Sequence, residues 1–262
     1  MPGSDRVPRE GVPGHGGAAK ADSMPRTLSP AAAAAGRVLQ VDAALPMFPL
    51  GSVLYPGMHL PLHVFEDRYR ALVNDLLTEP DESRRRLGIV AIREGYELGN
   101  HGMQSAHRIG CEALLVANRA YADGRFDIAV VGRRRLRLEA MDTSGDYLVG
   151  DVTYLGEHAG IGVVAADEAA RDAFERYRQA LASQSGPELP DDELPTNPQE
   201  LSYVLAATAS LTLRERQQLL EAPDTAERLR LVTVMIGDEL TAMRAVPSLP
   251  ATDLARTAWS PN

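Results

Sequence analysis

A change of periodicity between residues 45 and 77 constrains the fold of this chain more than any other feature. Two short apolar runs, residues 47–50 and 60–65, are rich in strand-forming residues. The stretch also holds Pro49, Pro56 and Pro61. Each proline removes a backbone N–H donor, so these strands are expected to be short, or to lie at a sheet edge or a bulge. The Pro56-Gly57 pair predicts a tight turn.

The spacing of apolar residues then becomes helical. The predicted apolar stripe consists of Phe65, Tyr69, Leu72, Val73, Leu76 and Leu77. Polar side chains take the opposite face, so this helix must bury its stripe against the sheet that the chain has just left. Glu66 and Asp67 begin the helix, where the dipole favours negative charge. Glu66 could also pair with an arginine from residues 133–137 and tie the helix to the sheet.

The rest of the first half also predicts strands. The expected strands are residues 87–92, 108–119, 126–130, 133–141 and 147–155. Ala122-Asp123-Gly124 predicts a hairpin turn between the strands at residues 108–119 and 126–130. In residues 133–141 the alternation places Leu136 inward and Arg135 outward. These short strands predict an antiparallel sheet curled into a partial β-barrel with one packed helix.

From residue 165 the periodicity is helical, with a polar linker at residues 183–196. Asn197, Thr212 and Asp224 each stand three residues before a glutamate, which is a signature of a helix start. Short connections between the resulting helices predict antiparallel neighbours in a helical bundle. The complete prediction is an α+β fold with a β-rich part at residues 45–160 and a helical part at residues 161–246.

The two ends are expected to lie outside this fold. Residues 1–44 are rich in Gly, Pro, Ala and Ser and hold few aromatic or β-branched residues. Such a segment cannot bury enough apolar surface to offset its chain entropy, so we predict a disordered arm. Residues 247–262 are predicted to form a loose tail.

Several motifs resemble one known family in the same order along the chain. LPMFPLGSVLYPG and LPLHVFEDRYRALVNDLL resemble the opening of the LON domain, the amino-terminal domain of Lon proteases. The similarity continues through LGIVAI and RIGCEALLVANRAYADGRFDIAVVGRRRLRL into the helical part. It implies a PUA-like β half followed by a helical bundle, and a role in contacting polypeptides.

Composition limits the compartment and the partners. The formal net charge is −9, which argues against non-specific binding to nucleic acid or to anionic membranes. Cys111 is the single cysteine, so no intrachain disulfide can form, and a cytoplasmic location is expected. No apolar run approaches the roughly 20 residues of a spanning helix.

Lysine usage excludes two chemistries of full-length Lon proteases. Lys20 is the only lysine, and an alanine follows it where a nucleotide-binding P-loop needs Ser or Thr. A serine–lysine peptidase dyad needs a lysine desolvated in a pocket, and a lysine in a solvated arm does not meet this need. We therefore expect no enzymatic activity and no cofactor.

Metal binding and thiol chemistry are not expected either. His59 and His63 lie four residues apart on a strand, about 13 Å between Cα atoms, which is too far to share a zinc ion. His101 and His107 flank a loop and could approach Cys111, but solvated loop histidines are the simpler interpretation. Cys111 within a strand is expected to be a small buried residue.

Function is therefore expected to reside in surface contact. Our hypothesis is a polypeptide-binding or adaptor module whose apolar loop residues repack around different partners. The candidate contact residues are Met47, Phe48, Tyr55, Met58 and Tyr121. Their alternative role is to close the ends of the barrel. Expected partners are unfolded client polypeptides, and a separate protease is left open, as is the oligomeric state.

Two other functions remain open at this stage. A PUA-like fold suggests RNA binding by analogy alone, and both the acidic charge and the lack of a visible aromatic stripe argue against it. The groove between the β half and the helical half could instead hold a small regulatory ligand.

Overall fold

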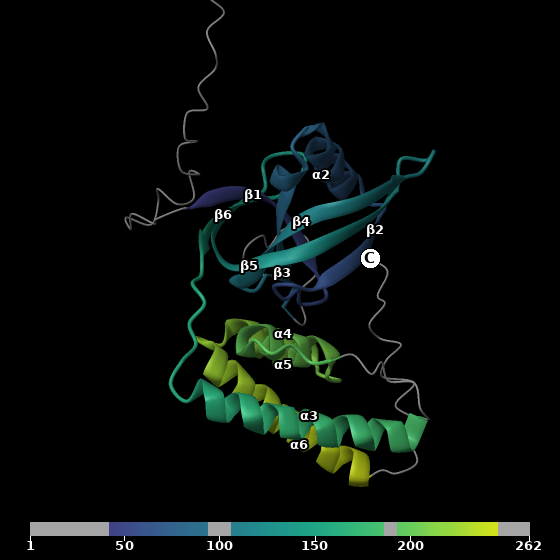
Figure 1. Ribbon diagram of the computed structural model, residues 1–262. Coiled ribbons are helices and arrows are strands. Elements are labelled where there is room, and N and C mark those ends of the chain that lie inside the picture. Colours follow the sequence, from purple (N-terminus) through teal and green to yellow (C-terminus); the bar gives the residue numbers. More distant parts are fainter. Residues whose placement is uncertain (1–41, 94–105, 186–192, 246–262) are drawn as a thin grey trace, which may run out of the picture.

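The computed structural model describes residues 42–93, 106–185 and 193–245, which form two lobes (Figure 1). We call residues 42–154 the β lobe and residues 163–245 the helical lobe. Most of the predicted arm, most of the loop after residue 93 and all of the predicted tail lie outside the described residues. Ala43 and Ala44, assigned to the arm, already pair with a strand.

The described strands of the β lobe form one mixed sheet. They are β1 (Ala43–Leu50), β2 (His59–Val64), β3 (Arg86–Ala91), β4 (Ile109–Ala120), β5 (Phe126–Asp142) and β6 (Val149–Tyr154). The order across the sheet is β2-β5-β4-β3-β1-β6, and β5 also pairs with β6. The pairings β5–β4–β3–β1–β6–β5 thus run in a closed circuit. The two runs predicted at residues 126–130 and 133–141 are one strand, which is bent by bulges.

One pairing contradicts the predicted antiparallel sheet. β1 and β3 are parallel, with Met47 opposite Gly88 and Leu50 opposite Ala91. Parallel neighbours need a long crossover connection. Residues 51–85, which include β2 and the first helix, provide it. The prediction failed because local periodicity carries no information about strand direction.

The prolines lie where the sheet needs no donor from them. β2 has a single neighbour, β5, so Pro61 stands on an edge strand, as predicted. Pro49 lies in the part of β1 that pairs with β3 alone, because β6 pairs only with residues 43–46. Gly57 of the predicted turn has a φ of 81°, which glycine adopts without strain.

The predicted helix is α2 (Asp67–Thr78), and it covers one side of the sheet. Its buried residues are Tyr69, Leu72, Val73 and Leu76. Phe65 precedes the helix and does not share this stripe. The predicted pairing of Glu66 with residues 133–137 is wrong, because Glu66 binds Arg68 at 2.7 Å. The short helix η1 (Glu82–Arg84) leads into β3.

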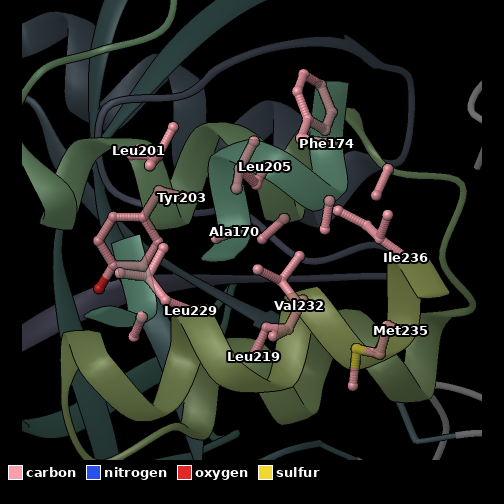
Figure 2. Close-up of a cluster of buried hydrophobic side chains, with 14 of the residues drawn as sticks. Ala170, Phe174, Leu201, Tyr203, Leu205, Leu219, Leu229, Val232, Met235 and Ile236 are labelled. Atoms are coloured by element: carbon pink, nitrogen blue, oxygen red, sulfur yellow. The ribbon is translucent and has the colours of Figure 1, made fainter. Parts of the chain in front are cut away.

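The helical lobe consists of α3 (Val163–Ser185), α4 (Pro198–Thr208), α5 (Leu213–Glu221) and α6 (Thr225–Ala245). All three predicted caps are confirmed. Asn197 accepts from the amide of Gln199, Thr212 forms a reciprocal capping box with Glu215, and Asp224 accepts from the amide of Glu227. Figure 2 shows the core between these helices, where Leu205, Leu229 and Val232 are fully buried.

A hydrogen-bonded network joins the lobes. Figure 1 shows α4 and α5 facing the sheet, with α3 and α6 beyond them. Arg135 of β5, predicted to face outward, is 2% exposed and donates to the carbonyl oxygens of Leu220 and Ala222. The predicted alternation of side chains along β5 was correct, since Leu136 and Arg135 lie on opposite faces. The face that holds Arg135 is covered by the helical lobe and not by solvent.

Candidate functional site

Three aromatic rings form a row on the β lobe, at the end of β2. We call His63, Phe65 and Tyr121 the aromatic row. The ring centroids of His63 and Phe65 lie 6.2 Å apart, and those of His63 and Tyr121 lie 6.3 Å apart. Phe65 is 42% exposed, and the other two rings are partly exposed. The β2–β5 register creates the row, because it brings the end of β2 beside the β4–β5 hairpin.

Charged side chains hold the Tyr121 end of the row. Asp127 hydrogen-bonds with His63 Nδ1 at 2.6 Å and accepts from the hydroxyl of Tyr121. The His63 hydrogen bond, followed by the Tyr121 hydrogen bond, holds the pKa of Asp127 below its usual range, and the bond to Asp127 raises the pKa of Tyr121. The guanidinium groups of Arg119 and Arg125 lie 5.3 and 5.8 Å from the Tyr121 ring centroid. These contacts order an otherwise exposed ring.

A small hollow continues the row at its Phe65 end. It is lined by Phe48, Pro49, Leu50, His63, Val64, Phe65, Glu66 and Tyr69. Its volume is 10 Å³, which suits about one water molecule. The hydroxyl of Tyr69 is buried and has no hydrogen-bond partner among the described residues. Burial raises the pKa of Tyr69 to about 12, so its hydroxyl keeps its proton and can donate it to an acceptor.

Burial contradicts the exposure on which three of the predicted contact residues depended. Met47 is 0% exposed, Phe48 is 4% exposed and Tyr55 is 2% exposed. Phe48 stacks on Tyr69 with centroids 4.1 Å apart, and Tyr55 donates from its hydroxyl to the carbonyl oxygen of Arg216. Apolar residues near prolines and glycines need not lie in exposed loops. Here Met47 and Phe48 belong to the buried strand β1, and Tyr55 is buried at the lobe junction.

The other two predicted residues are partly exposed. Tyr121 ends the aromatic row, whereas Met58 lies before β2 and packs against the cores of both lobes. His63 and Phe65 were not among the predicted contact residues. The signal for Phe65 was present, because the acidic residues that follow it indicate that the helix begins after it.

The described residues hold no group of three or more His, Cys, Asp or Glu side chains arranged for a metal ion. His63 is bound to Asp127, and His107 lies 3.5 Å from Glu221. His101 lies outside the described residues. Cys111 is fully buried, and burial raises the pKa of its thiol to about 12, so it is not an activated nucleophile.

A mixed sheet joined to a helical lobe is the architecture of Lon N-terminal domains. The crystal structure of a Lon N-terminal domain protein from Xanthomonas campestris matches with a TM-score of 0.55 at 22% identity, covering 73% of this chain and 98% of that chain. The N-terminal domain of Mycobacterium avium complex Lon protease matches with a TM-score of 0.54 at 20% identity, covering 75% and 99%. These likenesses show the fold.

The chain belongs to the family of the ATP-dependent protease La (LON) substrate-binding domain, whose model matches residues 44–238. Lon protease 2 of Syntrophobacter fumaroxidans is 29% identical over 197 residues, which make up 72% of this chain and 23% of that protein. Lon protease of Escherichia coli is 23% identical over 76% of this chain and 25% of its own length. The chain therefore spans about a quarter of the length of these relatives. Its homology is to a substrate-recognition module.

Across residues 42–93, 106–185 and 193–245, no helix has both the length and the apolar composition that a membrane crossing requires.

Proposed function

We propose that this protein binds polypeptides through the aromatic row and performs no catalysis itself. The observation that carries the proposal is the placement of three ordered, partly exposed rings beside a buried, unpartnered hydroxyl. Rings of this kind bury apolar side chains of a partner, and a single water molecule in the hollow could link the hydroxyl of Tyr69 to a peptide carbonyl. Membership of a substrate-binding family agrees with this chemistry.

The absence of catalysis is argued from the residues of this chain. Its only lysine, Lys20, is not followed by the hydroxyl residue that a P-loop needs, and Cys111 is buried and protonated. The clients that suit the row are unfolded polypeptides with exposed apolar side chains. A separate protease is the second partner that we propose, and the single cysteine supports a cytoplasmic location. The closed circuit of strand pairings supports the PUA-like barrel description of the β lobe.

Binding should be weak and tolerant of sequence, because few side chains make the contact and none forms a deep pocket. Titration of the protein with fluorescently labelled, reduced and carboxymethylated lactalbumin should show saturable binding at micromolar concentration. The double substitution Phe65→Ser and Tyr121→Ser should weaken that binding about tenfold, because two apolar contacts are lost.

Val234→Ser is the matched control, since Val234 is 62% exposed but lies on α6 in the other lobe. Saturable binding that is equal in the wild type and the double variant would exclude the aromatic row as the contact surface. No saturable binding at all would reject the function itself.

RNA binding is the competing proposal, and the aromatic row gives it a specific basis, because exposed rings flanked by arginines can stack on bases. Asp123 and Asp127 lie among these arginines and oppose a phosphate backbone. A labelled single-stranded oligoribonucleotide in the same titration separates the two proposals. Retention that falls steeply with salt would favour RNA. A ligand between the lobes remains a third proposal, although side chains of Tyr55, Arg135 and Gln217 hydrogen-bond across that junction.

A further inference from the structure

A cavity of 150 Å³ lies in the helical lobe, far along the chain from the aromatic row. It is lined by Ala159, Val163, Asn197, Pro198, Gln199 and Thr225. These residues belong to the linker after β6 and to the first turns, or the caps, of α3, α4 and α6. The N-termini of three helices therefore meet at one cavity, and Asn197 and Asp224 already cap those of α4 and α6, which leaves the N-terminus of α3 uncapped.

The cavity contains hydrogen-bond donors that the fold leaves unused. Thr225 is 2% exposed, and within the described part of the chain no hydrogen bond from its hydroxyl is present. The amides of Val163 and Val164 open α3 and likewise meet no acceptor in the described residues. The Thr225 hydroxyl lines the cavity, and the first-turn amides of α3 lie at an exposed helix end, so these donors are accessible to an anionic ligand.

Most nearby carboxylates are engaged elsewhere. Asp224 accepts from the amide of Glu227 at 2.8 Å as the cap of α6. Asp167 binds Arg171 at 2.8 Å, and Arg171 also donates to the carbonyl oxygen of Pro195, two residues before the α4 cap. Glu200 is exposed at the start of α4. Negative charge around the cavity is thus held in existing contacts or directed to solvent.

Two exposed apolar side chains stand next to the cavity along the chain. Ile161 is 93% exposed and Val164 is 68% exposed, and they flank the cavity residue Val163. Arg230 fixes this corner by donating to the carbonyl oxygen of Ile161. Isolated exposed apolar residues need no explanation, but two on either side of an unsatisfied donor cluster resemble the rim of a peptide site.

We propose that this cavity captures the chain-terminal carboxylate of a polypeptide whose last residues are apolar. The carboxylate would accept from the Thr225 hydroxyl and the free amides of α3, while the apolar side chains cover Ile161 and Val164. This site is distinct from the aromatic row and lies on the other lobe. A client could therefore be held by an internal apolar segment and by its end, which raises the effective concentration of each contact.

The test uses a fluorescein-labelled decapeptide that ends in Ala-Leu-Val, made with a free carboxylate and as the carboxamide. The free acid should bind about tenfold more tightly than the carboxamide to the wild-type protein, because a charge-assisted hydrogen bond is lost in the amide. Thr225→Val, which keeps the shape and removes the hydroxyl, should reduce binding of the acid by a similar factor and leave the amide unchanged. Gln199→Leu is the second variant: it removes a side-chain amide donor from the cavity lining and should also weaken the acid selectively, whether or not Thr225→Val folds.

Matched variants separate this site from the proposed function. Ile161→Ser should weaken both peptides, whereas Val116→Ser, on a β-lobe valine that is 49% exposed, should affect neither. The double variant Phe65→Ser and Tyr121→Ser should keep the preference for the free acid over the carboxamide. A negative result for polypeptide binding at the aromatic row would therefore leave the test of the cavity unaffected. Equal binding of acid and amide, or competition by N-acetylvaline as strong as by the peptide, would overturn the proposal.

Discussion

Gly132 lies where two segments of the β lobe approach each other closely. The amide of Gly57 donates to the carbonyl oxygen of Gly132, and the amide of Gly132 donates to that of Met58, both at 2.9 Å. A Cβ atom at residue 132 would lie 2.1 Å from the carbonyl oxygen of Tyr55 and 3.2 Å from Cys111 Sγ. Backbone cannot yield as a flexible side chain can, so only glycine fits here.

Gly132→Ala should therefore lower the free energy of unfolding by about 1–3 kcal/mol, the usual cost of overpacking. Urea denaturation followed by far-ultraviolet circular dichroism measures the change. Gly51→Ala is the control, because a Cβ there meets nothing within 4 Å, and its effect should stay within about 0.5 kcal/mol. Equal stability of the two variants would mean that residues 55–58 move away from β5 to make room for the added methyl group.

The helix α5 shows how a short element depends on its cap. It has 9 residues, fewer than an isolated helix needs, yet its end provides the carbonyl oxygen of Leu220 to Arg135. Thr212 accepts from the amide of Glu215, and Glu215 Oε2 accepts from the amide of Thr212 at 2.8 Å. The sequence predicted this start correctly because the cap is formed by neighbours in the chain.

Thr212→Ala should lower the free energy of unfolding by about 1 kcal/mol, because it leaves first-turn amides without acceptors. Thr241→Ala is the comparison, since that hydroxyl only bonds back to the carbonyl oxygen of Gly237 on an exposed face of α6. It should be neutral within about 0.5 kcal/mol. Thermal melts of both variants measure the difference, and a neutral Thr212→Ala would show that packing alone holds α5.

Across the complete fold, Glu157 is the centre of the lobe junction. Its carboxylate binds Arg135 at 2.6 Å, Arg228 at 3.4 Å and the hydroxyl of Tyr203 at 2.7 Å. Arg228 is 0% exposed and its guanidinium lies 4.1 Å from the Tyr203 ring centroid. Burial lowers the pKa of Arg228 and raises that of Tyr203. The Glu157 carboxylate offsets the cost of burying both groups, because it pairs with the Arg228 guanidinium and accepts from the Tyr203 hydroxyl.

Glu157→Gln should lower the free energy of unfolding by about 3 kcal/mol, because two buried guanidinium groups then lose their counter-charge. Hydrogen exchange in α4–α6 should accelerate with it, since one of the contacts that join the lobes is weakened. Glu175→Gln provides the control, as Glu175 is about half exposed and pairs with Arg178 on the surface of α3. If both variants lose equally little stability, the network does not join the lobes.

Local interactions made the helical half and the edge strand predictable from sequence. The caps at Asn197, Thr212 and Asp224 form between residues two or three positions apart. The position of Pro61 on an edge strand follows from its missing donor, and the burial of Leu72 and Val73 follows from helical spacing. Each of these outcomes depends on the nearest chain neighbours, so it could be predicted before any contact was known.

Only the tertiary structure decided which surfaces are free. Met47 and Tyr55 looked available in a stretch rich in proline and glycine, and packing against distant segments buries both. The aromatic row needs β2 to pair with β5, and the unused donors near Thr225 need three helix starts to meet. Both sites arise from residues far apart in the chain, because exposure and convergence are properties of long-range packing that local patterns do not contain.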